Sequence, residues 1–417
     1  MAGDVPKSMW ALRLHGAGMD RLRLEQVPVP QPGPGQLLGR VDAAIACASD
    51  NKIIDQGSEH TLMYGWDLAA HPVPIGHEGC ITVAEVGEGL GDRYEVGRRF
   101  AIQPAVPSGP RHHLDRYRDG AAGVEKIAVG YTLDGVFAEY VLITEEVIDT
   151  GCLLALRDEK MPYFAAALAE PLSCVVSAQE HSVHILKAGP GEPRRAHLGM
   201  RPGGVVVVIG AGPMGRMHVE VALSYGPKTV IVSEPLEARR RKLRSTVEQK
   251  ARRRGAALVC TAPDRLEEVV MAESGGRGAD DVIVALGIRA VQEQAISLLA
   301  RYGVANFFGG LKKGDHMISL DGRRIHYDSV TAVGSSGGDP SDVARALSLL
   351  ADGSIEAGHY VAAVGGLDAG RHLIEAVRGQ QLDGKGVIYP GASAALERVD
   401  GWDAQKEAAF LRENGRG

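Results

Sequence analysis

Residues 203–234 read GGVVVVIGAGPMGRMHVEVALSYGPKTVIVSE, and this stretch decides the fold. Residues 205–209 are an unbroken β-branched run, which is typical of a strand buried on both faces of a parallel sheet. A glycine-rich turn follows, then a helical stretch at 216–225 and a second strand at 229–233. Strand, turn, helix and strand in this order predict the βαβ unit of an α/β domain.

The turn itself, Gly210-Ala211-Gly212-Pro213-Met214-Gly215, fits the pattern G-x-G-x-x-G. Gly210 allows a tight turn out of the strand, and Gly212 lets a pyrophosphate approach the backbone because it has no side chain. Gly215 lets the helix pack close to the strand, and the free N–H groups of the helix N-terminus favour phosphate. The whole turn, with Pro213 and Met214, is therefore a predicted dinucleotide-binding site.

An acidic residue, Glu234, ends the second strand. There a carboxylate can accept hydrogen bonds from both adenosine ribose hydroxyls and repels a 2′-phosphate, which favours NAD over NADP. Arg239 follows closely, and an arginine at this place can receive a 2′-phosphate, so NADP stays the alternative. Gly287 and Gly309 end two later strands of the same region, and we expect them near the nicotinamide.

Length and composition describe an ordinary globular chain. At 417 residues it is too long for a single core, and its net charge of −6 gives no support for a nucleic-acid partner. No apolar run approaches the ~20 residues that cross a bilayer, and the N-terminal MAGDVPKSMW lacks the apolar region of a secretory signal. Five scattered cysteines indicate no disulfide framework. We therefore expect a reduced, cytoplasmic enzyme with no membrane partner.

The remaining pattern separates two kinds of structure. Short strands with frequent glycine fill the N-terminal part, whereas strands and helices alternate from residue 204 to about 350. Residues 107–126 are polar, basic and irregular, which predicts a surface lobe, and residues 187–202 are interpreted as a Pro/Gly-rich insertion. Residues 236–254 predict a long basic helix, and a solvated surface is a better interpretation of its charges than an anion-binding face.

Four residues outside the dinucleotide region are candidate metal ligands: Cys47, His77, Glu78 and Glu170. Thiolate, imidazole and carboxylate together are the donors of a catalytic zinc that keeps one position open for water or substrate. Taken singly, Cys47 is better explained as a small buried residue and His77 as a loop histidine. Together, ahead of a dinucleotide fingerprint, they predict a zinc that lowers the pKa of a bound alcohol or polarises a carbonyl during hydride transfer.

At these residues the chain resembles the zinc-dependent medium-chain dehydrogenase/reductases, especially their sorbitol, polyol and sugar-phosphate branch. The motifs are C-x-S-D at 47–50, G-H-E at 76–78, D-G-x-F-A-E-Y at 134–140, E-P-L at 170–172 and the fingerprint at 210–215. The resemblance implies an α/β protein in which a doubly wound Rossmann domain interrupts a GroES-like, β-rich catalytic domain. The expected parts are catalytic domain at 1–172, NAD-binding domain at 173–350, and catalytic domain with a C-terminal extension at 351–417.

The same resemblance implies roles at the site. Cys47 and His77 would hold the zinc with Glu78 and Glu170, one of which can exchange for water or substrate. Ser49 would bond the reacting oxygen and relay its proton, while Asp50 orients His77 or Cys47. Lys52, or its neighbour Asn51, is nearest to the place where the alcohol dehydrogenase branch has a relay histidine. Ser49, Glu78 and Lys52 are therefore the expected catalytic residues.

Two further comparisons with relatives bear on metal and substrate. Many relatives carry a structural zinc on four clustered cysteines, but the lobe at 107–126 contains none, so we expect one catalytic zinc and surface roles for His112 and His113. Residues 306–311 and 325–327, NFFGGL and IHY, resemble the L-sorbose 1-phosphate reductase-like relatives. A phosphate needs a cation near the cleft. The candidates are Arg111, Arg116, Arg118 and Lys126, but a solvated loop is a better interpretation of all four.

The predicted function is zinc-dependent hydride transfer between NAD and a secondary alcohol or ketone of a polyol, cyclitol or sugar phosphate. One alternative is a threonine-type or simple alcohol dehydrogenase of the same fold. The other is a zinc-free binding protein that kept the fold without the chemistry. By the resemblance we expect a homodimer or homotetramer.

Overall fold

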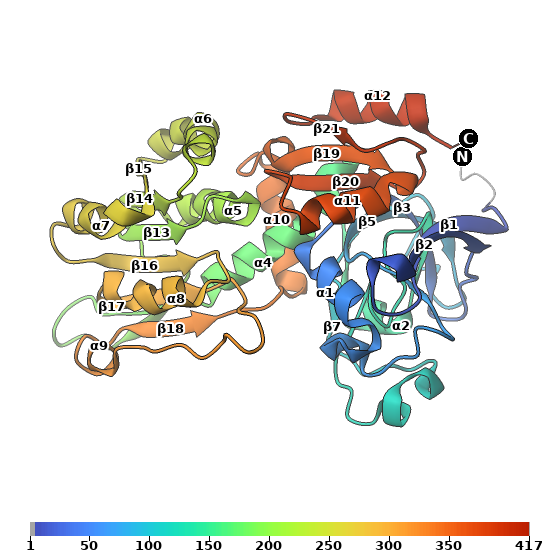
Figure 1. Ribbon diagram of the computed structural model, residues 1–417, viewed down its shortest axis with the longest axis horizontal. Helices are drawn as coiled ribbons and strands as arrows, with labels where there is room; N and C mark the ends of the chain where they lie inside the picture. The colour runs from blue at the N-terminus through green and yellow to red at the C-terminus, as the bar shows by residue number, and fades with distance from the viewer. Residues whose placement is uncertain (1–4, 417) are drawn as a thin grey trace. The chain divides into compact units, whose positions relative to one another are not determined.

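The computed structural model of the chain describes residues 5–416, and the chain divides into two compact units (Figure 1). The second unit is Leu172–Gly338, and the first joins the residues before it to those from Asp339 onward. The first boundary lies beside the expected one at 172/173. The second lies before 350/351, so α10 (Pro340–Ala351) belongs to the first unit, where it packs against β10 and α3. The sequence predicts it in the second unit, because a helix after a strand continues the βα alternation.

The second unit contains a six-stranded parallel sheet in the order β15-β14-β13-β16-β17-β18. The chain builds outward from β13 to one edge, then returns and builds outward to the other. This places a topological switch point between β13 and β16, where doubly wound sheets bind ligands. The strands are β13 (Val205–Ile209), β14 (Thr229–Ser233), β15 (Ala257–Thr261), β16 (Ala279–Val284), β17 (Leu299–Phe307) and β18 (Thr331–Gly334).

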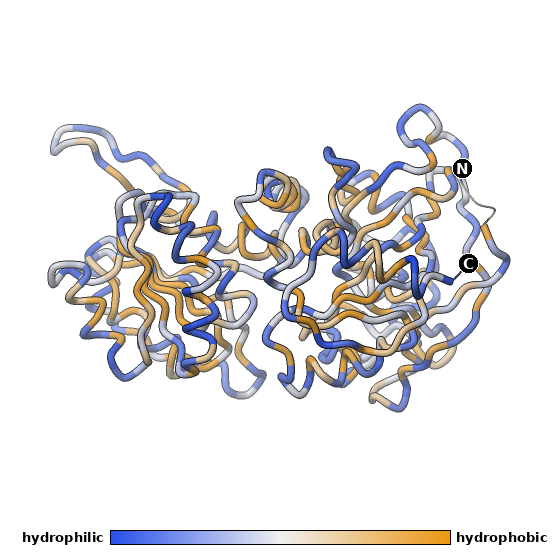
Figure 2. Tube along the Cα trace, turned by 90° about the horizontal axis from the view of Figure 1, so that it is seen from above, coloured by the Kyte–Doolittle hydropathy of each residue, from blue (hydrophilic) through white to orange (hydrophobic). Residues whose placement is uncertain are grey.

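Helices cover both faces of this sheet, because the side chains of a strand alternate between its two faces. Val207 of β13 shares a core with Val270 of α7, whereas its neighbour Val208 shares another with Val219 of α5 and Leu243 of α6. In Figure 2 the strands of this unit accordingly form an orange, apolar layer. The doubly wound prediction is confirmed. The helices are α5 (Pro213–Ala222), α6 (Glu237–Arg253), α7 (Leu266–Ser274), α8 (Arg289–Ala295) and α9 (Gly322–Tyr327).

The segment interpreted as an insertion contains a strand. β12 (Arg195–Leu198) pairs antiparallel with β11 (Val183–Leu186), so a hairpin precedes β13. All four side chains of β12 are exposed or half-buried, and the segment therefore lacks the buried apolar alternation that identifies a strand. The basic helix α6 is present as predicted, with Arg240 and Arg244 paired to Glu237 on its exposed face.

The first unit is built on an eight-stranded, mostly antiparallel sheet in the order β10-β6-β5-β3-β20-β19-β21, with β9 also paired to β3. A three-stranded sheet, β2-β1-β4, and a β7-β8 pair complete its strands. The N-terminal strands are β1 (Ser8–Leu14), β2 (Leu22–Pro28), β3 (Leu37–Ile45), β4 (Val73–Pro74), β5 (Glu78–Val86), β6 (Arg99–Ile102), β7 (Ala105–Val106), β8 (Ile127–Ala128), β9 (Tyr140–Ile143) and β10 (Leu153–Ala155). The C-terminal strands are β19 (Val361–Gly366), β20 (Lys385–Tyr389) and β21 (Glu397–Arg398).

Short helices connect these strands. They are α1 (Ala48–Gln56), α2 (Glu145–Asp149), α3 (Tyr163–Ala167), α11 (Gly370–Arg378) and α12 (Ala404–Asn414), while α4 (Ala169–Glu180) leads into the second unit. The predicted irregular lobe is confirmed between β7 and β8, where only short 3₁₀ turns occur. Within residues 5–416, none of the helices combines the length and the apolar character that crossing a bilayer demands.

The C-terminal extension has a structural role. Glu407 of α12 is buried, and its carboxylate accepts the backbone N–H groups of Tyr163 and Phe164 at the first turn of α3. It also accepts the hydroxyl of Tyr389, which in turn accepts the indole N–H of Trp402. The extension therefore caps α3, and α3 packs on β3 and β5.

Candidate active site and cofactor site

Three adjacent strands of the first unit meet at one end of the sheet. Ile45 of β3 pairs with Glu78 of β5 on one side and with Val387 of β20 on the other. Cys47 follows β3 by two residues, His77 immediately precedes β5, and Lys385 begins β20. Residues that are far apart in sequence therefore come together because their strands are neighbours.

The predicted ligands Cys47, His77 and Glu78 form one cluster. Their possible ligand atoms, a sulfur, an imidazole nitrogen and a carboxylate oxygen, all lie within 4.8 Å of one another. Glu78 and His77 are buried, whereas Cys47 is partly accessible. The turn before His77 depends on Gly76, which has φ of +94° and faces the ring of Phe137.

Asp50 fixes two members of this cluster. Its Oδ1 lies 3.0 Å from Nδ1 of His77, and its Oδ2 accepts the backbone N–H of Cys47 at 2.8 Å. A carboxylate at Nδ1 leaves Nε2 as the nitrogen that can bind a metal. Burial by itself lowers the pKa of His77, but the charge and hydrogen bond of Asp50 and the contact with Cys47 outweigh it and raise the pKa. The expected contacts of Asp50 are present with both residues.

Ser49 lies beside the possible ligands and is partly accessible. Its hydroxyl donates to Sγ of Cys47 at 3.0 Å and lies 3.1 Å from Nε2 of His77. The phenol of Tyr131 also bonds to Ser49, and burial raises the pKa of this phenol. The ring of Tyr131 stands between two imidazoles, with centroids 5.9 Å from His77 and 5.2 Å from His60. Sequence reasoning missed Tyr131, because its place depends on the fold of the loop after β8.

Lys385 is the second residue that sequence reasoning missed. Its ammonium donates to both carboxylate oxygens of Glu78, at 2.8 and 2.7 Å, and both side chains are buried. Burial alone lowers the pKa of Lys385, but the charges of Glu78, Cys47 and Glu170 outweigh it, so this pKa is raised. The signal that identifies it in hindsight is a lysine at the start of an otherwise apolar strand, K-G-V-I-Y.

Glu170 and Lys52, the two other residues predicted for this site, do not belong to the close cluster. Glu170, in the first turn of α4, is buried, and its charge acts on Lys385. It is not one of the three residues of the close cluster, and its role as a ligand stays a prediction. Lys52 is exposed on α1, and its charge, after burial, lowers the pKa of His60. Its catalytic role also stays a prediction.

The donors in the cluster fit a zinc ion. Cys47 supplies a soft thiolate, His77 an imidazole and Glu78 a carboxylate, which is the mixture that catalytic zinc binds. The nearby carboxylates of Asp50 and Glu170 add two further negative formal charges, and the ammonium of Lys385 adds one buried positive charge. A divalent ion would balance this local excess of negative charge.

In the second unit, the glycines of the fingerprint occupy the positions that their predicted roles require. Gly210 has φ of +104°, which L side chains rarely adopt. A methyl group on Gly215 would overlap with the carbonyl oxygen of Gly210, whereas one on Gly212 would meet no atom within 4 Å. Gly215 therefore permits close packing of α5 on the turn, and Gly212 leaves open backbone at the helix N-terminus, beside Pro213 and Met214.

Glu234 is buried at the end of β14. Its carboxylate accepts the backbone N–H of Ala211 at 2.9 Å and that of Leu236 at 3.0 Å, so it also holds the fingerprint turn. Arg239 lies 3.8 Å from this carboxylate. That Glu234 selects NAD stays a prediction, as does the alternative that Arg239 binds the 2′-phosphate of NADP.

Gly287 and Gly309 lie together beyond the ends of β16 and β17. A methyl group on Gly309 would overlap with the backbone of Leu286, and one on Gly287 with the carbonyl of Gly310. Leu286 in turn packs against Gly210. The two predicted strand ends and the fingerprint turn therefore meet at the switch point of the sheet.

Comparisons with known proteins agree with this geometry. Residues 33–150 match the family described as "Alcohol dehydrogenase GroES-like domain", and residues 213–352 match "Zinc-binding dehydrogenase". The protein YggP of Escherichia coli K12 is 31% identical over 92% of this chain and 87% of its own length. The chain belongs to the zinc-binding medium-chain dehydrogenases. The family brings with it zinc, a nicotinamide cofactor and the oxidation or reduction of alcohols and carbonyls.

Two other relatives point to the polyol and sugar-phosphate branch. Mannitol-1-phosphate 5-dehydrogenase of Aliivibrio fischeri is 29% identical over 94% of this chain and 89% of its own length. L-Sorbose 1-phosphate reductase of Klebsiella pneumoniae is 29% identical over 93% and 89%. Among solved structures, 2R,3R-butanediol dehydrogenase of Bacillus subtilis superimposes with a TM-score of 0.71 at 22% identity, covering 92% of this chain and 99% of that one, which shows the shared fold.

Proposed function

We propose that this protein is an NAD- and zinc-dependent dehydrogenase that interconverts a secondary alcohol and a ketone on a sugar phosphate, with polyols and cyclitols as the wider class. The observation that carries the proposal is the cluster of Cys47, His77 and Glu78 within 4.8 Å, in a chain that also contains the dinucleotide fingerprint. The names of two relatives with matched lengths, one acting on mannitol 1-phosphate and one on L-sorbose 1-phosphate, favour the phosphorylated sugars.

In this proposal the metal would be held by Cys47, His77 and a carboxylate from Glu78 or Glu170. When bound there, zinc lowers the pKa of a substrate hydroxyl or polarises a ketone. Asp50 keeps the imidazole of His77 in the tautomer that leaves Nε2 free. Glu78 is held by Lys385 through both oxygens, so this lysine sets how readily Glu78 reaches the metal.

Proton and cofactor handling follow from the neighbouring residues. Ser49 is partly accessible and lies beside both Cys47 and His77. When the alcohol is oxidised, its hydroxyl therefore receives the proton of the substrate as it passes its own proton on to solvent. Glu234 binds the adenosine ribose, and its charge disfavours a 2′-phosphate, while Arg239 is near enough to soften that preference. The nicotinamide lies by Gly287 and Gly309. The homodimeric or homotetrameric state and the cytoplasmic location remain predictions from the sequence.

The test combines metal analysis with a substrate panel. The purified protein is assayed by NADH or NADPH absorbance with hexose and hexitol phosphates, free polyols, cyclitols, L-threonine and simple secondary alcohols. We expect tightly held zinc, the highest kcat/KM on a phosphorylated substrate, and a preference for NAD of about tenfold or more, equivalent to about 1.4 kcal/mol.

Other outcomes would replace the proposal. The highest kcat/KM on L-threonine or on a simple alcohol would favour a threonine-type or simple alcohol dehydrogenase. Protein that holds no zinc and turns over none of these substrates would favour a binding protein that kept the fold.

A further inference from the structure

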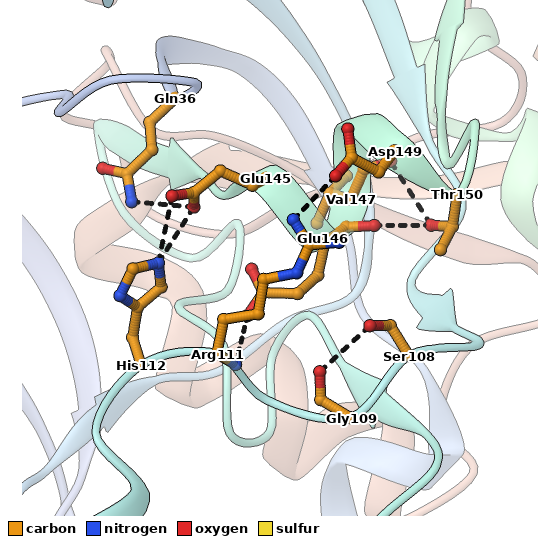
Figure 3. A network of polar contacts seen from close by, with 10 residues as sticks. All are labelled: Gln36, Ser108, Gly109, Arg111, His112, Glu145, Glu146, Val147, Asp149 and Thr150. Carbon is orange, nitrogen blue, oxygen red and sulfur yellow. Dashed lines mark hydrogen bonds and ion pairs between the residues drawn. The ribbon is translucent and has the colours of Figure 1, made fainter.

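A second group of possible metal ligands lies in the first unit, where the irregular lobe meets α2. His112 comes from the lobe between β7 and β8, and Glu145 and Glu146 open α2. The possible ligand atoms of these three residues lie within 4.8 Å of one another. Figure 3 shows the imidazole of His112 directed at the carboxylate of Glu145, with Nε2 3.1 and 3.0 Å from its two oxygens.

Glu146 gives the strongest indication of a bound ion. Its side chain is 1% exposed, and its Oε1 accepts the backbone N–H of Arg111 at 2.7 Å. Its Oε2 is buried and accepts no hydrogen bond from any residue among 5–416. A buried carboxylate oxygen without a donor is costly, so this atom requires a cation or water.

A cavity provides room beside that carboxylate. It has a volume of about 250 Å³, and Glu146, His112, Thr144 and Gln36 are among the residues that line it. This exceeds the ~30 Å³ share of one liquid water, so an ion can enter with several waters. The hydroxyl of Thr144 is also buried and, within the described chain, has no hydrogen-bond partner. It is therefore available to a water bound to such an ion.

The nearby cations are already engaged. The guanidinium of Arg111 pairs with Asp149 at 2.6 Å, as Figure 3 shows. Arg116 lines the cavity but lies over the ring of Trp66, 5.5 Å from its centroid. Gln36, a neutral donor, bonds to Oε2 of Glu145 at 3.0 Å. Within residues 5–416, no arginine or lysine forms an ion pair with the carboxylate of Glu145 or of Glu146.

We propose that His112, Glu145 and Glu146 form a second site, which binds a divalent transition-metal ion. One imidazole and two carboxylates are donors for Zn²⁺ or Mn²⁺, while the imidazole disfavours Mg²⁺ and Ca²⁺. Metal–ligand bonds of about 2.0–2.2 Å place neighbouring donor atoms roughly 3–4 Å apart. Small side-chain rotations would bring the three donor atoms, which now lie within 4.8 Å of one another, to that spacing. His112 therefore has a further role beyond the surface role expected from the sequence, and His113 stays outside the site.

The proposed ion would tie the lobe to the body of the unit. His112 lies in a segment without strands, whereas Glu145 and Glu146 follow β9, which pairs with β3 in the main sheet. Binding would link these two parts and protect the lobe from local opening. This site shares no residue with the Cys47 cluster, so it stands or falls independently of the proposed function.

The experiment uses full-length, zinc-loaded protein and Mn²⁺ as the probe. Free Mn²⁺ is measured by electron paramagnetic resonance, and zinc stays on the thiolate of Cys47 because Mn²⁺ prefers oxygen and nitrogen donors. We expect one Mn²⁺ per chain, and a loss of affinity of about tenfold or more in both His112→Ala and Glu146→Gln, the scale on which disturbed ligand shells weaken metal sites. His113→Ala is the matched control and should bind as the wild type does.

A second readout follows the lobe directly. Trypsin cleavage after the exposed Arg118 should be slowed by Mn²⁺ in the wild type and in His113→Ala, but not in His112→Ala. The proposal is overturned if the wild type binds no Mn²⁺, or if His112→Ala binds it as tightly as His113→Ala does. Because His112 is exposed, its replacement leaves the fold intact and decides the question even if Glu146→Gln does not fold.

Discussion

The fingerprint turn and the Cys47 cluster, which the proposed function assigns to one reaction, are built in opposite ways. The turn takes its glycines and its acid from one continuous stretch, 203–234, in which each residue has a local role. The Cys47 cluster and its neighbour Lys385 come from the end of β3, from β5 and from β20, which meet only because β3 lies between β5 and β20. A dinucleotide site can therefore be recognised from spacing, whereas a metal site depends on which strands become neighbours.

The replacement Cys47→Ser should separate the two regions most sharply. A hydroxyl is a far poorer zinc ligand than a thiolate, so we expect loss of tightly bound zinc and a fall in kcat/KM of at least about 1,000-fold, equivalent to about 4 kcal/mol. NADH binding, measured by fluorescence titration, should be unchanged because the fingerprint lies in the other unit. Full zinc content with full turnover would refute the assignment of Cys47.

The replacement Lys385→Met tests how far the cluster depends on long-range pairing. It leaves the carboxylate of Glu78 buried without its cation, which we expect to lower the free energy of unfolding of metal-free protein by about 3 kcal/mol. Urea denaturation measures the change, and Lys385→Arg is the control that keeps the charge.

The double variant Lys385→Met with Glu78→Gln completes the Lys385 test. Removing both charges should restore part of the lost stability, because no buried charge is then left unpaired. If the double variant is as unstable as the sum of the two single variants, the pair contributes no coupling and this account of Lys385 is wrong.

The replacement Gly215→Ala tests the fingerprint turn and should leave the Cys47 cluster unchanged. The added methyl group overlaps with the carbonyl of Gly210 and displaces the turn, so NADH affinity should fall about a hundredfold, equivalent to about 2.7 kcal/mol. Zinc content should be retained. Gly322→Ala, where a methyl group meets no atom within 4 Å, is the control in the same unit. Unchanged NADH binding in Gly215→Ala would contradict the close packing.

Acid should lower the free energy of unfolding through His218 of α5, which lies in the continuous stretch 203–234. Burial lowers the pKa of His218 from 6.5 to about 3, so the folded state keeps this imidazole neutral while the unfolded chain takes up a proton below pH 6.5. Stability is therefore complete above pH 6.5 and falls as the pH drops towards 3. The loss is about 1.4 kcal/mol per pH unit, or about 2 kcal/mol at pH 5.

The variant His218→Gln should remove this share of the acid dependence, as measured by urea midpoints between pH 7 and pH 5. His316→Gln, which changes an exposed histidine of the same unit, should leave the dependence as it is. Equal pH slopes in the wild type and in His218→Gln would show that His218 does not titrate as described.

Much of the fold could be predicted from the sequence because its signals are local. The β-branched run of β13, the fingerprint and the alternation after it identified the parallel sheet, and the six-stranded order confirms it. The β12 strand was not predicted because its side chains are largely exposed. α10 packs in the first unit, whereas the alternation placed it in the second, because alternation describes succession along the chain and not the partner against which a helix packs.

The metal site could be predicted only in part. Cys47, His77 and Glu78 lie close together, as expected. They could be predicted because each stands in a short recognisable motif. Lys385 stands in no such motif, and its contact with Glu78 depends on the pairing of β20 with β3. Tyr131 likewise reaches Ser49 only through the fold of a loop. Such residues are defined by strand order, which local patterns do not contain.

The interruption of the first unit by the second has a consequence for synthesis. β20 lies in the interior of the main sheet, between β3 and β19, yet it is among the last strands to leave the ribosome. Until then the nascent chain carries β3 paired with β5 and β9 but with one edge unpaired at Ala44 and Ile45, and Glu78 without its ammonium partner. The second unit is therefore synthesised in full before the first unit can complete its main sheet, and Glu78 gains Lys385 only after that.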